Sequence, residues 1–162
     1  MNIRIANIGE IDGIMDVYAA ARQFMRTTGN ENQWIGGYPS RELLLKDIRN
    51  KDLYVCISDK NMILGVFYFK VEEDKTYINI YEGQWLNDKP YGVVHRIASN
   101  GKQKGIADFC LRWCLEQCNN IRIDTHRDNI VMQNILKKNN YTQCGIIYIA
   151  DGSERIAFQK TL

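Results

Sequence analysis

The chain has 162 residues, 45% of them hydrophobic, so it is long enough to bury one core and predicts a single domain over 1–162. Its 21 Lys and Arg residues against 19 Asp and Glu leave a net charge of +2, which gives no general attraction to nucleic acid or to an anionic membrane. No apolar run approaches the roughly 20 residues that span a bilayer, and the N-terminal residues lack the layout of a secretion signal. We therefore expect a cytoplasmic protein with no nucleic-acid or membrane partner.

The first third of the chain predicts one strand followed by two helices. Residues 3–7 alternate between apolar and polar side chains, and the apolar residues of 11–25 recur at helical spacing. The stretch 30–40 is rich in turn-forming residues yet carries two aromatic side chains, so a long aromatic loop is expected there. Ser40 is a good helix start, and a second helix is expected to run from it to Ile48.

The rest of the chain predicts six strands and two helices. Two segments dense in β-branched and aromatic residues, 53–58 and 62–71, flank a polar turn and predict an antiparallel hairpin. A long polar connection follows. The later elements are expected as a strand at 91–99, a helix at 105–118, a strand at 121–126, a helix at 129–139, and strands at 141–149 and 154–160. The predicted order is β-α-α-β-β-β-α-β-α-β-β.

Three of the five cysteines form a stripe on one predicted helix. Cys110, Cys114 and Cys118 recur every four residues, which places them along one helix face. A zinc site needs ligands that converge from several directions, whereas one straight helix offers a row. We therefore interpret the stripe as part of the core, expect no metal, and disfavour a thiol that carries an acyl intermediate.

The most informative stretch is the predicted strand 91–99 with the basic, glycine-bearing loop that follows it and opens a helix. The first N–H groups of a helix lack partners and the helix dipole is positive there, so a diphosphate fits such a place. Gly105 lets the backbone approach a phosphate closely, while Lys102 and Lys104 add positive charge. The loop has neither the GxxxxGK[ST] nor the GxGxxG order, so the familiar mononucleotide and dinucleotide loops are disfavoured.

The loop residues Lys102-Gln103-Lys104-Gly105-Ile106-Ala107 resemble the acyl-CoA signature [QR]xxGx[GA] of the GCN5-related N-acetyltransferase (GNAT) superfamily. Lys102 departs from the first position, since it keeps a charge but lacks the planar amide or guanidinium group. The segment that follows the strand 121–126 is also similar to the family. There an N-x-x-A helix closes with Gly-Phe, and here Asn129 begins the helix, Met132 replaces the Ala, and Asn140-Tyr141 replaces Gly-Phe.

The resemblance covers roughly residues 53–162 and is best from 91 to 145. It implies an α/β (α+β) GNAT-like acyl-CoA N-acyltransferase fold, with a mixed, mostly antiparallel sheet of six to seven strands flanked by about four helices. It also implies an enzyme that transfers an acetyl group from acetyl-CoA, a co-substrate, to a primary amine by direct attack. The amine would belong to a small molecule or a peptide N-terminus. The alternative is a non-catalytic acyl-CoA-binding regulatory module.

The resemblance further implies that the strands 91–99 and 120–126 splay apart and leave backbone groups free for the pantetheine arm. The backbone of Ile97 and Ser99 would bond the arm, and an N–H near Ile97 or Ala98 would face the thioester oxygen. Asn129 would bond the pantetheine, or else serve only to cap its helix. The expected cofactor-binding set is Ile97, Ala98, Ser99, Lys102, Gln103, Lys104, Gly105, Ile106, Ala107 and Asn129.

Transfer to an amine needs a neutral amine, yet only about one part in a thousand of an alkylamine with a pKa near 10 is neutral at pH 7. The candidates for a base are His95, His126, Asp124 and Glu82, with His95 favoured because it lies on the cofactor strand. Each histidine could instead be a hydrogen-bonded residue of the sheet. In many family members a Tyr on the last helix protonates the leaving thiolate; here that position is Leu136. The thiolate would leave unaided or take a proton from water or Tyr141.

Aromatic side chains crowd the two irregular segments that frame the acceptor cleft in the family. Trp34, Tyr38, Tyr81 and Trp85 are expected to wall a pocket for a small apolar or cationic amine. The alternative is that they close the ends of the core and help a homodimer contact.

Overall fold

The computed structural model describes all of residues 1–162, and its element order is the predicted one. The strands are β1 (Asn2–Ile5), β2 (Leu53–Ile57), β3 (Ile63–Val71), β4 (Gly92–Ser99), β5 (Asn120–Thr125), β6 (Thr142–Tyr148) and β7 (Glu154–Thr161). The helices are α1 (Ile11–Thr27), α2 (Arg41–Arg49), α3 (Ile106–Cys118) and α4 (Ile130–Lys138), with short 3₁₀ turns at Ile8–Glu10 and Lys75–Tyr77. None of the helices combines the length and the apolar composition needed to cross a membrane.

All seven strands join one sheet in the order β1-β2-β3-β4-β5-β7-β6. Every neighbouring pair is antiparallel except β4 and β5, which run parallel. The expected fold class, a mixed and mostly antiparallel sheet with four flanking helices, is confirmed. The parallel pair is connected through α3, as a parallel crossover requires.

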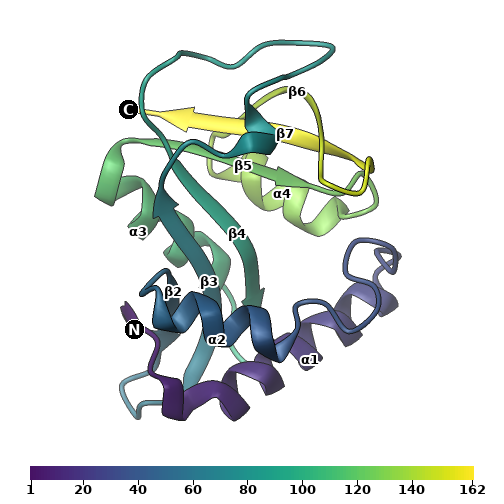
Figure 1. Cartoon of the computed structure of the whole chain (residues 1–162). Coiled ribbons are helices and arrows are strands. Elements are labelled where there is room, and N and C mark those ends of the chain that lie inside the picture. Colours follow the sequence, from purple (N-terminus) through teal and green to yellow (C-terminus); the bar gives the residue numbers. More distant parts are fainter.

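The parallel pair β4 and β5 is joined only at its beginning. Gly92 pairs with Ile121 and Val93 with Arg122, and no pairing follows toward the strand ends. In Figure 1, β3 and β4 stand steeply in the view, in opposite directions, whereas β5 and β7 lie almost across it, so the two halves of the sheet diverge. The ends of β4 and β5 therefore enclose a gap in the ladder, as the resemblance implied.

A β-bulge in β4 lies beside this gap. Val66 of β3 pairs with Ala98 and Tyr68 with His95, so Phe67 faces two residues of β4, Arg96 and Ile97. Arg96 takes the left-handed conformation, with φ of 51°. A bulge bends its strand and increases the local twist, which separates the end of β4 from β5.

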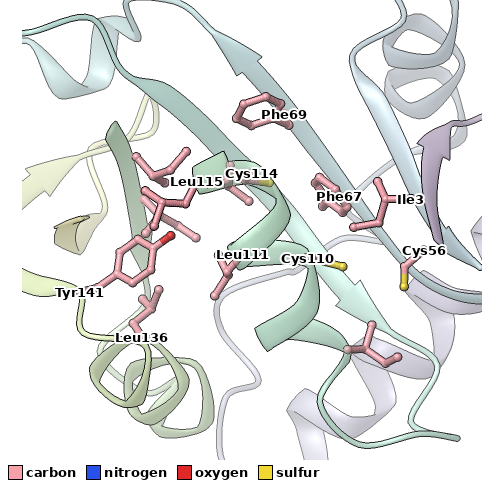
Figure 2. Close-up of a cluster of buried hydrophobic side chains, with 14 of the residues drawn as sticks. Ile3, Cys56, Phe67, Phe69, Cys110, Leu111, Cys114, Leu115, Leu136 and Tyr141 are labelled. Atoms are coloured by element: carbon pink, nitrogen blue, oxygen red, sulfur yellow. The ribbon is translucent and has the colours of Figure 1, made fainter. Parts of the chain in front are cut away.

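One face of the sheet is covered by α3 and α4. Figure 2 shows the apolar side of α3, with Leu111, Cys114 and Leu115, packed against Phe69 and Phe67 of β3. Cys110 and Cys114 are buried and Cys118 is half-buried, and all five cysteines are free thiols. The interpretation of the cysteine stripe as core is confirmed.

The opposite face is covered by α1 and α2 at the β1–β4 end and by the long connection between β3 and β4 at the other end. Ile14 and Tyr18 of α1 pack on Val55 and Val66 of the sheet. The connection places Tyr77 over the far half of the sheet, in a cluster with Tyr91, Val93, Ile147 and Ala157. Trp85 stabilises this segment, because its Nε1 donates a hydrogen bond to the Tyr77 carbonyl at 2.8 Å.

Candidate active site

A cavity of about 1170 Å³ opens where β4 and β5 part. Its walls come from the end of α1 and the loop after it, from β4 and the start of α3, from α4, and from the β6–β7 hairpin. Typical small-molecule sites measure roughly 300–1,000 Å³. This cavity therefore has the volume for more than one small substrate.

Strand β4 presents a free backbone edge to the cavity. The N–H of Asn100 donates to the Leu64 carbonyl of β3 at 3.0 Å. Backbone direction alternates along a strand, so Ala98 also faces β3, while the backbone groups of Ile97 and Ser99 face β5. No β5 residue pairs with them, so their N–H and C=O groups are open to a ligand.

The loop from Asn100 to Gly105 leads directly into α3 at one end of the cavity. Gly105 is the N-cap, in the left-handed conformation with φ of 80°, and no side chain caps the helix. The first N–H groups of α3 are thus left without a side-chain partner. Gln103 and Lys104 line the cavity, but Lys102 lies outside it, so this predicted cofactor residue is not brought to the site.

Asn129 caps α4 and also crosses to another segment. Its Oδ1 accepts from the N–H of Met132 at 2.9 Å, and its Nδ2 donates to Oε1 of Gln33 at 2.9 Å. The capping alternative is therefore present in the structure. The contact with Gln33 joins the loop after α1 to the start of α4 at the cavity wall.

His95 lies on the free half of β4 and forms a pair with Asp74. Its Nε2 is 2.7 Å from Oδ2 of Asp74. Burial alone would raise the pKa of Asp74, but hydrogen bonds from His95 and Thr76 outweigh it and hold that pKa at about 2. Asp74 is ionised near neutral pH and lies against Nε2, so in the neutral form of His95 the proton is on Nε2 and Nδ1 is the free acceptor. His95 and Asp74 both line the cavity.

Asp124 lies on the same face of the sheet as His95, on the facing strand. Tyr77 donates its hydroxyl to Oδ2 of Asp124 at 2.6 Å, and its ring centre is 6.0 Å from that of His95. Burial and the nearby Asp124 carboxylate raise the pKa of Tyr77 well above its usual value, so its hydroxyl stays a donor. Tyr77 thus connects the two predicted candidates His95 and Asp124.

The other two base candidates lie outside the cavity. His126 falls in the turn after β5, where its Nδ1 accepts from the N–H of Asp128 at 3.0 Å. Burial and the neighbouring Arg155 lower the pKa of His126. Glu82 is solvent-exposed in a turn, with φ of 55°. The expectation that His126 shares a strand face with Asp124 is wrong, because β5 ends at Thr125.

Two of the four aromatic candidates reach the cavity. Trp34 and Tyr38 line it, with ring centres 6.3 Å apart. Tyr81 instead pairs its backbone with Ile146 of β6, and Trp85 covers the core beside Tyr77, so neither lines the cavity. The alternative, closure of a core end, describes Trp85.

The last helix offers no hydroxyl to the cavity. Leu136 is fully buried in the core beneath α4, and Tyr141 packs in the same cluster with its hydroxyl enclosed and unpartnered (Figure 2). Burial raises the pKa of Tyr141 far above its usual value. Tyr141 is therefore a poor proton source, and a proton for the leaving group must come from water or another group.

An ion pair that the sequence analysis missed supports the bulge. Arg96 donates to Oδ2 of Asp47 in α2 at 2.6 Å, with only 11% and 7% of the two side chains exposed. Tyr18 of α1 donates to the Arg96 carbonyl at 2.7 Å. No local pattern marks these residues as partners, since they come from three separate elements. No group of three or more His, Cys, Asp or Glu side chains converges in the structure, so we name no metal ligands.

Solved structures with the same architecture include acetyltransferases. A GNAT-family acetyltransferase from Streptococcus agalactiae is 36% identical, with a TM-score of 0.89, over 99% of this chain and 95% of its own. A putative acetyltransferase from Staphylococcus aureus is 20% identical, with a TM-score of 0.73, over 99% of each chain. A chain of the NatC complex bound to Gag peptide and CoA is 14% identical, with a TM-score of 0.58, over 99% of this chain and 98% of its own.

No protein-family model matches the chain, and no curated protein sequence does. The fold and the parted strands define an acyltransferase. At 36% identity over nearly the whole length of both chains, this protein belongs to the GNAT family of acetyltransferases.

Proposed function

We propose that the protein transfers an acetyl group from acetyl-CoA to a primary amine, on a small molecule or a peptide N-terminus, by direct attack. The observation that carries the proposal is that the free edge of β4 has the uncapped start of α3 at one end and the His95–Asp74 pair near the other. An anion site, free strand donors and a base thus lie along one cavity, in the order that a long acyl-CoA and its acceptor need.

The residues at the start of α3 fit the diphosphate of CoA. A Cβ placed on Gly101 or Gly105 would meet no atom within 4 Å, so there is room beside the backbone. The N–H groups and the positive dipole end of α3 favour an anion there, with Lys104 adding charge. The NatC chain, solved with CoA, has this fold, which also supports acyl-CoA as the donor.

When bound, acetyl-CoA supplies the acetyl group as a thioester. The free N–H groups of Ile97 and Ser99 are positioned to hold the pantetheine arm, and one of them can donate to the thioester oxygen as negative charge develops there. Asp124 attracts the acceptor as an ammonium ion, and Nδ1 of His95 takes the proton that the amine must lose, directly or through water. The amine nitrogen forms its bond to the acetyl carbon as the carbon–sulfur bond breaks.

A regulatory module that binds acyl-CoA without turnover would need no base at the cavity. The His95–Asp74 pair lines the cavity beside the free edge of β4, which favours a catalyst over such a module. The test is incubation with acetyl-CoA and a panel of amines, with free CoA thiol as the readout. Amine-dependent thiol release is expected; binding of acetyl-CoA with no release from any amine would favour the module.

We also propose a cytoplasmic location and a homodimer. Five free thiols are typical of a reducing compartment. Tyr81 and Tyr148 are 51% and 45% exposed with ring centres 5.4 Å apart, at the edge of the sheet next to β6. A second copy would cover such aromatic surface, and sedimentation of the wild type against Tyr81→Ser tests this.

A further inference from the structure

Arg155, at the start of β7, is a buried cation that forms no salt bridge. The nearest acidic influence on it is Asp151 in the β6–β7 turn, an exposed residue that also lines the cavity and whose pKa is lowered by hydrogen bonds from Ser153 and also by Arg155. Arg155 is 6% exposed and lines the cavity. Its one hydrogen bond to the protein runs from Nη1 to the Glu154 carbonyl at 2.8 Å. The Glu154 carboxylate turns away and pairs with Arg127 at 3.4 Å, and no other carboxylate lies within 4.0 Å of Arg155.

Two other arginines with largely buried side chains are compensated by the protein itself. Arg96 forms its ion pair with Asp47. Arg122 lies between the rings of Trp85 and Tyr91, 4.3 and 4.1 Å from their centres, and donates to the Asn87 carbonyl at 2.7 Å. A buried charge without a partner is costly, so such charges are usually paired or bind a ligand.

The guanidinium of Arg155 is also open toward the cavity. In Arg96 and Arg122, the Nε atom is shielded from solvent and makes no hydrogen bond. Arg155 has no nitrogen that is shielded from solvent and also lacks a hydrogen bond. The nitrogens of Arg155 that make no hydrogen bond therefore keep accessible surface. In a residue that lines the cavity, this surface is available to a ligand.

Arg155 lies on the same face of the sheet as Asp124. Ala157 is directly opposite Asp124 on the neighbouring strand, and Arg155 is two residues before Ala157. Residues directly opposite share a face, residues two apart on a strand do too, and such diagonal neighbours are roughly 7–8 Å apart. The carboxylate of Asp124 and the guanidinium of Arg155 therefore belong to diagonal neighbours on one face of the sheet.

We propose that the acceptor amine carries a carboxylate a few bonds from its nitrogen, as an amino acid does, and that Arg155 binds this carboxylate. This inference rests on the proposed transfer to an amine, and it narrows the acceptor class. The planar guanidinium matches a carboxylate with two parallel hydrogen bonds. Asp124 and His95 then receive the amine end, so each charge of the acceptor faces a group of opposite charge or a base on the same face of the sheet.

A phosphate of CoA is the other source of a negative charge. The start of α3 follows β4, whereas Arg155 lies on β7, and β5 stands between these strands in the sheet. The diphosphate site and Arg155 are therefore on opposite sides of β5. This placement favours the acceptor over the diphosphate as the ligand of Arg155.

The test compares free amino acids with their carboxamides as acceptors, in wild type, Arg155→Gln and Arg155→Lys. We expect wild type to prefer the acids by about 10²-fold in kcat/KM. Arg155→Gln should abolish that preference through the KM for the acid, and Arg155→Lys should keep part of it. Arg122→Gln is the matched control, because Arg122 is buried on the adjacent strand outside the cavity, and it should keep the preference.

Two further readouts separate the outcomes. The melting temperature should fall in Arg122→Gln but not in Arg155→Gln, since the latter removes a buried charge that forms no salt bridge. With CoA present, the difference between the thermal shifts given by amino acids and by carboxamides measures carboxylate binding without turnover. Loss of this difference in Arg155→Gln supports the carboxylate site even if no thiol is released. Absence of thiol release would overturn only the proposed transfer. Equal use and equal binding of acids and carboxamides overturns the inference. So does an Arg155→Gln effect confined to the KM for acetyl-CoA.

Discussion

The hydroxyl of Tyr77 donates a 2.6 Å hydrogen bond to Asp124, 47 residues further along the chain. Tyr77 belongs to the connection between β3 and β4, and Asp124 to β5. The bond therefore ties the connection that carries Asp74 to the strand on the far side of the parting. It fixes Asp124 at the cavity, on the same face as His95.

Tyr77→Phe should lower the free energy of unfolding by about 1.5–3 kcal/mol, because it leaves the partly buried Asp124 carboxylate without its donor while the ring is kept. Urea denaturation measures the change. Tyr148→Phe is the control, since that tyrosine is exposed at 45%, and its effect should stay within about 0.5 kcal/mol. Equal effects of the two substitutions would contradict the role given to this hydrogen bond.

Asp47→Ala should destabilise the protein by about 3–5 kcal/mol, because it leaves the buried Arg96 guanidinium without its partner. The exposed pair of Asp12 with Arg41, at 2.8 Å, provides the comparison. Asp12→Ala should cost less than about 1 kcal/mol. Thermal and urea unfolding measure both variants, and a loss for Asp47→Ala as small as for Asp12→Ala would show that the pair does not hold the bulge.

The contribution of Asp74 to stability should depend on pH at the acid end. Its pKa in the folded protein is about 2, below its ordinary value of 3.8, so the ionised form stabilises the fold above about pH 4. That contribution is lost as the pH falls from 4 toward 2. The difference in unfolding free energy between wild type and Asp74→Asn should shrink over this range, as urea titrations at successive pH values would measure. A difference that stays constant down to pH 2 would contradict the depressed pKa.

Acetyl-CoA should stabilise the protein against unfolding by about 2.7 kcal/mol at one hundred times its dissociation constant. Gly105→Glu should abolish the shift, because it places a carboxylate where the diphosphate is proposed to lie. Gly29→Glu is a matched control: both glycines have φ near 80° at a helix end, and neither leaves a neighbour within 4 Å of an added Cβ. Loss of the shift in both variants, or in neither, would show that the start of α3 is not the site.

The local sequence pattern was sufficient to predict the order of the elements and the glycine-bearing loop that leads into α3. Helical spacing, strand alternation and turn residues act within a few positions, so each element could be predicted from its own residues. The predicted strand 121–126 runs one residue past the end of β5 at Thr125, because the sequence gives no mark of where β5 ends and its turn begins.

The partners of His95 could not be predicted in the same way. Asp74 lies 21 residues before His95 in a polar connection without periodicity, and only the tertiary path of that connection brings the two together. The same holds for Arg96, whose pairing with Asp47 depends on the bulge in β4 and on the position of α2. Nothing in the local sequence distinguishes Arg155 from other charged strand residues, because its burial and its lack of a salt bridge depend on the tertiary structure.

The most direct test of acetyl transfer with His95 as the base is the steady-state rate of CoA thiol release at saturating acetyl-CoA, with and without an accepted amine, in wild type, His95→Ala and His126→Ala. We predict release that depends on the amine, a loss of about 10²–10⁴-fold in His95→Ala with the acetyl-CoA thermal shift retained, and a near-normal rate in His126→Ala. Release that is independent of the amine, or a near-normal rate in His95→Ala, would contradict this mechanism.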